Sequence, residues 1–264
     1  MRRREFTLTA LALVGALPAA PAAAQSRLKV VASFSILGDM LREIGGDRIE
    51  LRTLVGPDQD GHTYQPTPSD AKAVAEARIL VINGLGFEGW IERLARSAPF
   101  KGTRIVASQG VATPLRMAEG HSEPLSTRKT QKAPRSVPDP HCWQDLANGQ
   151  LYVRAIAAAL VTADAANAAY YEQRAADYAS RLAALDDWVK QQIATVPPAK
   201  RKVITGHDAF SYFGRAYGVE FRAPTGISTD EEPSARDVAA LIRQIRSEGI
   251  KAIFIENMSN PKLI

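Results

Sequence analysis

The chain has 264 residues, of which 45% are hydrophobic and 23% charged, enough to bury a core in one large domain or two smaller ones. A single cysteine excludes both an intramolecular disulfide framework and a cysteine-based zinc module. The net charge is +5, but the basic residues are scattered and form no stripe with interleaved aromatic residues. We therefore do not expect nucleic-acid binding.

The first 24 residues have the pattern of a secretory signal peptide. Three arginines at positions 2–4 precede an apolar stretch, Leu8–Leu17, that is too short to cross a bilayer as a helix. A run of small residues then ends at Ala24, where we expect cleavage. The arginines also resemble a twin-arginine signal, so the export route stays open. We expect a soluble, monomeric protein in the periplasm.

Beyond residue 24, short apolar runs alternate with helical patterns. Seven runs rich in β-branched residues predict strands: Leu28–Ser33, Ile49–Val55, Ile79–Asn83, Arg104–Ala107, Lys202–Thr205, Val219–Arg222 and Ala252–Ile255. Thr67 and Pro68 form a start signal for a helix at Ala71–Ala77, and Ser234 does the same for Val238–Ile245. Such alternation is typical of parallel sheets covered by helices, so we expect an α/β fold.

One longer helix interrupts this alternation. From Ala165 to Ile193 there is no Gly or Pro. An apolar stripe recurs there in steps of three and four residues, at Tyr171, Ala175, Tyr178, Leu182, Leu185 and Val189. At 1.5 Å per residue the helix would run about 40 Å, roughly the diameter of a domain. We expect a rigid connector at residues 165–196 between a first lobe at 25–164 and a second at 197–264.

Two further features complete the expected architecture. Residues 115–139 show almost no apolar periodicity and predict a loop. Trp90, Trp143 and Trp188 are expected in the core.

Three of the four histidines lie in loops shaped by Gly or Pro. His62 and His207 each follow a predicted strand, and His141 lies in a proline-rich segment. In open α/β sheets, ligands bind beyond the carboxyl ends of the strands, and imidazole is the commonest metal ligand in proteins. The pattern is compatible with a metal site in a cleft between lobes, but spacing alone leaves solvated loop histidines equally possible.

Five segments together resemble one family. His62–Asp70 resembles the first metal motif of the cluster A-I solute-binding proteins, which serve ABC transporters for zinc and manganese. Further segments resemble motifs of that family in the same order: Asn83–Trp90, Asp139–Trp143, His207–Phe213 and Gly226–Ser234. The match runs from about Lys29 to Ile264. It implies two α/β lobes that are joined by a rigid helix, with the metal site in the cleft between them.

The resemblance also implies the ligands and the metal. His62 and His141 would bind the ion from the first lobe, and His207 from the second. Members with His at the third position suit zinc, whereas those with Glu tend towards manganese, which prefers carboxylate ligands. We therefore expect no enzyme but an exported protein that captures Zn²⁺, with Mn²⁺ less favoured, and delivers it to the membrane permease of an ABC transporter.

Some features depart from the family pattern. The family's fourth ligand, an Asp, would lie beyond Ile264, and Ser259 or Asn260 would cap a helix there, so the chain looks shortened. Water, Asp208 or Glu256 would then complete the coordination, and we expect weaker zinc binding than in a longer version.

Cys142 and His121 lie near the motifs and have side chains of types that can bind metal. Cys142 stands where relatives usually carry an apolar residue, and we expect it to be buried rather than bound to metal. His121, in the loop before the second motif, is expected to be solvated, with a weak accessory zinc site as the alternative.

Other functions use the same residues. A zinc hydrolase would need three histidines, an open coordination position and a carboxylate base such as Asp208 or Glu256. The chain has no H-E-x-x-H helix and no nucleophile elbow. A metal-dependent adhesin of the same fold is a further alternative.

Overall fold

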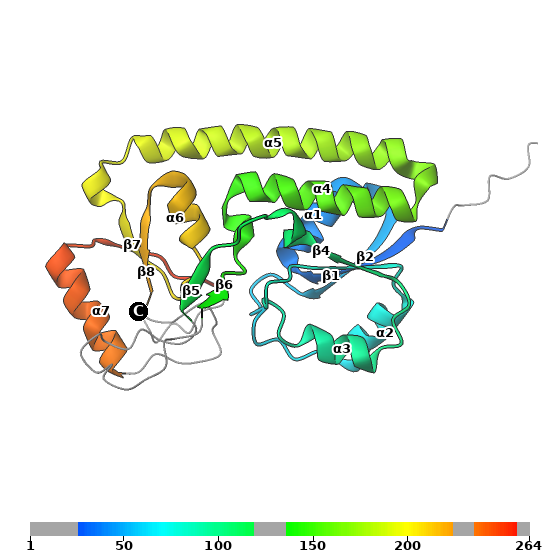
Figure 1. Ribbon diagram of the computed structural model, residues 1–264, viewed down its shortest axis with the longest axis horizontal. Coiled ribbons are helices and arrows are strands. Elements are labelled where there is room, and N and C mark those ends of the chain that lie inside the picture. Colours follow the sequence, from blue (N-terminus) through cyan, green and yellow to red (C-terminus); the bar gives the residue numbers. More distant parts are fainter. Residues whose placement is uncertain (1–25, 119–135, 224–234, 258–264) are drawn as a thin grey trace, which may run out of the picture.

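The computed structural model describes residues 26–118, 136–223 and 235–257. The expected signal peptide, His121, the motif at 226–234 and the expected helix start at 259–260 lie outside the described residues. Two groups of strands lie towards opposite ends of the molecule, and one long helix runs past both of them (Figure 1). Among the described residues, no helix combines the length and the apolar character that a membrane span requires.

The first sheet has four parallel strands in the order β2-β1-β3-β4. They are β1 (Leu28–Phe34), β2 (Ile49–Val55), β3 (Ile79–Ile82) and β4 (Thr103–Val106). Every residue of β3 is buried, which explains its unbroken apolar sequence, because helices cover both faces of the sheet. We call these strands and the helices packed on them the first lobe.

The helices of the first lobe lie on both sides of its sheet (Figure 1). On one side are α1 (Ser35–Gly45) and α4 (Leu146–Ala163). On the other are α2 (Pro68–Glu76) and α3 (Ile91–Ser97). The helix predicted after Thr67 is therefore present as α2, and Pro68 is its first residue.

The second lobe is built on three parallel strands in the order β8-β7-β9. They are β7 (Lys202–Ile204), β8 (Glu220–Arg222) and β9 (Ala252–Ile253), and the helices are α6 (Ser211–Tyr217) and α7 (Ala235–Glu248). All seven predicted strands are present and the α/β class is confirmed.

The segment predicted as a loop at residues 115–139 is only partly one. Its two ends form short strands, β5 (Arg116–Ala118) and β6 (Ser136–Pro138), which pair in antiparallel fashion. Three-residue strands carry too little periodic pattern to be recognised in a sequence. Residues 119–135 lie outside the described part of the chain.

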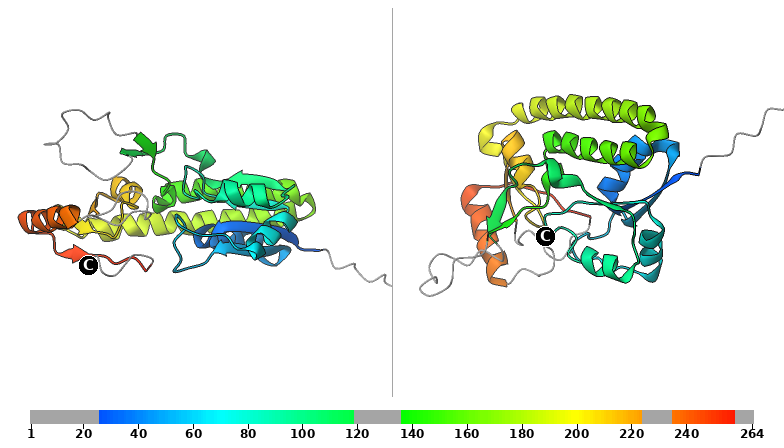
Figure 2. Two further views of the ribbon diagram at one scale, coloured as in Figure 1. Left: turned by 90° about the horizontal axis from the view of Figure 1, so that it is seen from below. Right: turned by 45° about the vertical axis from the view of Figure 1, so that its right-hand side comes forward.

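The long connecting helix is α5 (Ala168–Ala194), preceded by one 3₁₀ turn at Ala165–Asn167. Figure 2 shows α4 alongside its first half. Tyr171, Ala175 and Leu182 are buried, but Leu185 is 44% and Trp188 55% exposed.

The expectation of a core Trp188 is therefore wrong. The reason is the antiparallel packing of the two helices. Leu182 lies against Gly149 near the start of α4, so the residues that follow have passed the end of their partner helix.

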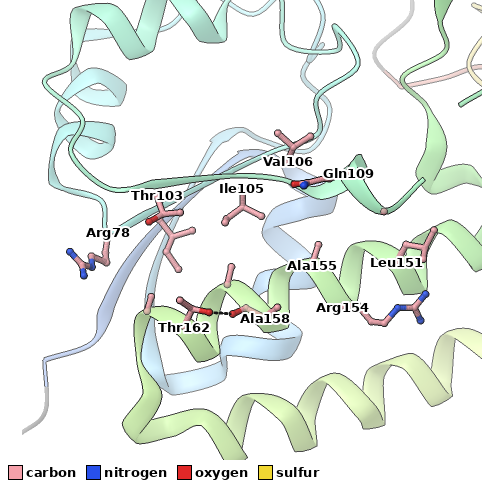
Figure 3. A pocket seen from close by; sticks show the side chains of 14 residues that line it. Arg78, Thr103, Ile105, Val106, Gln109, Leu151, Arg154, Ala155, Ala158 and Thr162 are labelled. Carbon is pink, nitrogen blue, oxygen red and sulfur yellow. Dashed lines mark hydrogen bonds between the residues drawn. The ribbon is translucent and has the colours of Figure 1, made fainter. Parts of the chain in front are cut away.

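A cavity of about 700 Å³ opens between β4 and α4 (Figure 3). Small side chains on α4, among them Ala155 and Ala158, leave this space open. None of the described residues that line it is a His, Cys, Asp or Glu, so it offers no strong metal ligand. The candidate metal chemistry lies elsewhere, between the two lobes.

Candidate metal centre

The structure brings together the three histidines selected from the sequence. Nε2 of His62 lies 3.1 Å from Nε2 of His141. The ring of His207 is centred 5.8 Å from that of His62 and 5.4 Å from that of His141. One ring nitrogen from each residue lies within 4.8 Å of the others, and all three side chains are almost wholly buried. Three nitrogen donors at these separations can surround one small cation.

The loop after β2 holds His62 through several local contacts. The carboxylate of Asp60 accepts hydrogen bonds from the backbone N–H of His62 at 2.8 Å and from the hydroxyl of Thr63 at 2.9 Å. The indole N–H of Trp90, a core residue as expected, donates to the carbonyl of Gly61 at 2.8 Å. The loop ends at Thr67, where a capping box starts α2. His62 is thus fixed on both sides.

The imidazole of His141 is oriented by a buried carboxylate. Oδ1 of Asp139 lies 2.8 Å from Nδ1 of His141 and accepts the backbone N–H of the same residue at 2.9 Å. Asp139 has no exposed surface. A carboxylate on one ring nitrogen fixes the tautomer and makes the opposite nitrogen a better ligand. Nε2, the atom nearest His62, is therefore left to bind metal.

Asn83 and Tyr152 support the same segment and were not identified from the sequence. The side-chain N–H of Asn83 donates to the carbonyl of Pro140 at 2.9 Å, and its carbonyl accepts the hydroxyl of Tyr152 at 2.6 Å. Both residues are fully buried. The available signal was the position of Asn83, a polar residue directly after a buried strand and inside a family motif.

The candidate ligand of the second lobe, His207, is oriented by Glu256. Nδ1 of His207 lies 2.5 Å from Oε2 of Glu256. Oε1 accepts the backbone N–H groups of Gly206 at 2.8 Å and His207 at 3.1 Å. Burial alone would raise the pKa of Glu256, but these contacts with His207 and Gly206 hold it below its usual value.

The other residues considered as ligands lie outside the histidine cluster. Among the described residues, the group of metal-binding atoms within 4.8 Å contains the three imidazoles and no carboxylate or thiol. Asp208 accepts a hydrogen bond from Ser211 at 3.2 Å, and its pKa is raised by burial and by the nearby charge of Asp139. Cys142 is buried, as expected, with its sulfur directed to the carbonyl of Asp139.

A cavity of about 480 Å³ between the lobes contains the three histidines. One wall is aromatic: Phe87 lies edge-on to His62 with ring centroids 4.6 Å apart, and Trp143 lies 5.3 Å from His141 in the same way. Trp143 is half-buried and lines the cavity, whereas we expected it in the core. The wall shields one side of the cluster from water.

Burial keeps His62 and His141 in the uncharged form that can bind a cation. It lowers the pKa of His62 to about 3, helped by the neighbouring His141 and His207. Burial also lowers the pKa of His141, although Asp139 opposes the shift. At neutral pH both rings are uncharged and keep a lone pair on one nitrogen, which is the form that binds metal.

The depressed pKa of His62 predicts how the metal-free protein responds to acid. Because the unfolded chain takes up a proton near pH 6.5 and the folded protein does so only near pH 3, stability is lost as the pH falls through that window. At pH 5, about 1.5 units below the pKa of the unfolded chain, this residue lowers the free energy of unfolding by about 2 kcal/mol, because each pH unit corresponds to 1.36 kcal/mol. Urea unfolding between pH 7 and pH 5 measures it.

The matched control for this prediction is His62→Gln, which cannot take up a proton. The variant should show a shallower fall in unfolding free energy over the same range. Equal slopes in the two proteins would show that the imidazole of His62 is not held uncharged by the fold.

Comparison with known proteins gives the family. Residues 30–264 match the family model described as zinc-uptake complex component A, periplasmic. The manganese ABC transporter substrate-binding lipoprotein PsaA of Streptococcus pneumoniae is 32% identical over 237 residues, covering 88% of this chain and 72% of the relative. The manganese-binding lipoprotein MntA of Halalkalibacterium halodurans is 31% identical, with coverage of 88% and 72%.

Solved structures agree with this result. The periplasmic zinc-binding protein TroA of Treponema pallidum superposes with a TM-score of 0.77 at 28% identity, covering 89% of this chain and 80% of that one. The family consists of transport proteins that bind their substrate and are not enzymes, which rules against the hydrolase alternative. The chain belongs to the zinc-uptake component A family and is a metal-binding substrate-binding protein of an ABC transporter.

Proposed function

We propose that this protein captures Zn²⁺ with His62, His141 and His207 and delivers it to the membrane permease of its ABC transporter. The observation that carries the proposal is the set of donor atoms: three buried imidazoles, one nitrogen from each within 4.8 Å of the others. Zinc commonly takes nitrogen ligands in tetrahedral sites, and the fourth position would go to water or to a carboxylate.

The donor set favours zinc over manganese. Several relatives are named for manganese, and TroA of Treponema pallidum is named for zinc. For a given set of nitrogen and oxygen ligands, affinity rises from Mn²⁺ to Zn²⁺, and manganese is best served by carboxylates and water. A cluster of three imidazoles without a carboxylate among its described members therefore argues for zinc as the cargo.

We propose that the chain is exported and acts as a monomer in the periplasm. In this proposal residues 1–24 are a signal peptide, residues 25–164 and 197–264 are the two lobes, and residues 165–196 are the connector. The unbroken α5 supports the connector, because it packs on α1 and α4 in the first lobe and receives a hydrogen bond from Tyr217 of the second. Small relative movements of the lobes would open the site to the permease.

Competition between the two metals tests the choice of cargo. The metal-free protein is dialysed against equal concentrations of Zn²⁺ and Mn²⁺, and bound metal is measured by mass spectrometry. We expect close to one zinc per chain and little manganese. Retention of manganese in the presence of equal zinc would contradict the proposed cargo, and binding of neither metal would contradict the proposed function as a whole.

A further inference from the structure

One buried tyrosine connects the two lobes beside the metal site. Tyr212 lies in the first turn of α6, and its side chain has no exposed surface. Its hydroxyl accepts a hydrogen bond from the backbone N–H of Leu115 at 2.8 Å and donates one to the backbone carbonyl of Asp139 at 3.2 Å. Leu115 directly precedes β5 and Asp139 directly follows β6, on the path from β4 to α4 of the first lobe. The hydroxyl of Tyr212 therefore links the second lobe to this path.

One end of this bridge is Asp139, the residue whose carboxylate orients the candidate ligand His141. The backbone N–H of Asp139 donates to the carbonyl of Leu115 at 2.8 Å, so the two partners of Tyr212 are also joined to each other. The carboxylate of Asp139 holds Nδ1 of His141 at 2.8 Å. A shift of the Tyr212 hydroxyl would therefore move Asp139 and, through its carboxylate, the imidazole of His141.

The other end of the bridge is joined to the second-lobe ligand. His207 and Tyr212 are five residues apart in the chain. Between them, the backbone N–H of Ala209 donates to the carbonyl of His207 at 3.0 Å, and α6 begins at Ser211. Since Glu256 also anchors the backbone of His207, this short segment has little freedom to move independently of α6.

We infer that Tyr212 is a positioning residue that sets the separation of His141 and His207 before metal arrives. The inference rests on the proposed function, since it concerns how that site is assembled. A site whose ligands come from two lobes binds metal tightly only if the lobes are already aligned. Otherwise the free energy of ordering the lobes is subtracted from the free energy of metal binding. Opening the lobes would remove this partner from the half-buried N–H of Leu115 and from the buried carbonyl of Asp139, which disfavours opening.

A further contact between the lobes differs from that of Tyr212 because it is exposed to solvent. The side chain of Asn257 donates to Asp58 across the cavity mouth, but that contact is exposed to solvent. It competes with water and holds the lobes less firmly than a buried hydroxyl does.

A matched control lies on the same helix. The hydroxyl of Tyr217 accepts the backbone N–H of Leu146 at 3.4 Å and donates to Asp186 at 2.8 Å. It ties α6 to the start of α4 and to α5, without contacting a residue bonded to a candidate ligand. Tyr217→Phe removes one buried hydroxyl from α6, as Tyr212→Phe does, but leaves the connection to His141 intact.

The test compares zinc release from the two variants. Each full-length protein is loaded with Zn²⁺ and mixed rapidly with excess chelator. We expect Tyr212→Phe to release zinc about three- to tenfold faster than the wild type, the range that one hydrogen bond can supply, and Tyr217→Phe to stay within about twofold. Urea unfolding of both variants shows whether their losses of stability are alike, so that release can be compared at matched stability. Equal release by Tyr212→Phe and wild type, or equal acceleration in both variants, would overturn the inference.

A second measurement uses the unmodified protein without metal. If the bridge is closed before metal arrives, the amide of Leu115 should be strongly protected from hydrogen exchange in the metal-free wild type. Exchange at the rate of an open amide would overturn the inference even if zinc binds well. A wild-type chain that binds no divalent metal would overturn the proposed function and, with it, the role of Tyr212 in metal release.

Discussion

Replacing any one of His62, His141 and His207 by alanine is expected to lower zinc affinity more than about 100-fold. Loss of a residue that only orients a ligand typically costs 10- to 100-fold, and loss of a ligand removes a metal bond outright. The effect should be similar at all three positions, because one nitrogen from each ring belongs to the same cluster. Isothermal titration of the metal-free variants with zinc, under competition from a chelator, measures the affinities.

The control is the fourth histidine of the chain. From its place in the sequence we expect His121 to be no ligand, so His121→Ala should bind zinc as the wild type does. Circular dichroism of each metal-free variant shows whether it has kept its fold. A folded variant at one of the three positions that retains wild-type affinity would remove that residue from the site.

Asp139→Asn is expected to lower zinc affinity about 10- to 100-fold while changing the stability of the metal-free protein little. The asparagine carbonyl can still accept the two hydrogen bonds that Oδ1 of Asp139 accepts from His141. What disappears is the negative charge that makes the imidazole a stronger donor to metal. Because the charge is fully buried, its removal also relieves a desolvation cost, so stability need not fall with affinity.

Asp145→Asn provides the comparison for this prediction. Asp145 caps α4 by accepting the backbone N–H of Ala147 at 2.9 Å, and asparagine caps helices about as well as aspartate. This variant should bind zinc and unfold as the wild type does. If Asp139→Asn kept full affinity, or lost affinity only in proportion to lost stability, the carboxylate would be structural rather than part of the site.

The fold could be predicted because its strands are apolar and its helix starts are marked by residue type. Leu80, Val81 and their neighbours in β3 are buried on both faces, which leaves a continuous apolar run in the sequence. Thr67 and Pro68 mark the start of α2 through side-chain chemistry that acts within one turn. Signals of this kind are local, so a single sequence contains them.

The candidate ligands were found for a different reason. His62 and His207 directly follow predicted strands, and parallel strands bring their carboxyl ends to one edge of a sheet. That rule locates the loops but not the distance between lobes. Spacing alone therefore did not decide whether the three histidines are metal ligands or solvated loop residues. The ordered family motifs favoured metal ligands.

The supporting residues could not be predicted because their partners are distant in the chain. Tyr212 bonds to Leu115 and Asp139, 97 and 73 positions away, and Tyr152 bonds to Asn83, 69 positions away. A buried tyrosine hydroxyl has the same sequence signature as a core aromatic residue. Likewise, the exposure of Trp188 depends on where α4 begins relative to α5, which no pattern within α5 records.

The most direct test of the zinc site is anomalous diffraction at the zinc absorption edge from crystals of the zinc-loaded protein. We expect one strong peak per chain, about 2.1 Å from Nε2 of His62 and Nε2 of His141. The same distance is expected to Nε2 of His207, because Nδ1 of that ring faces Glu256. A peak bound instead by Cys142 or Asp208, or no peak among the three imidazoles at full zinc occupancy, would contradict the account.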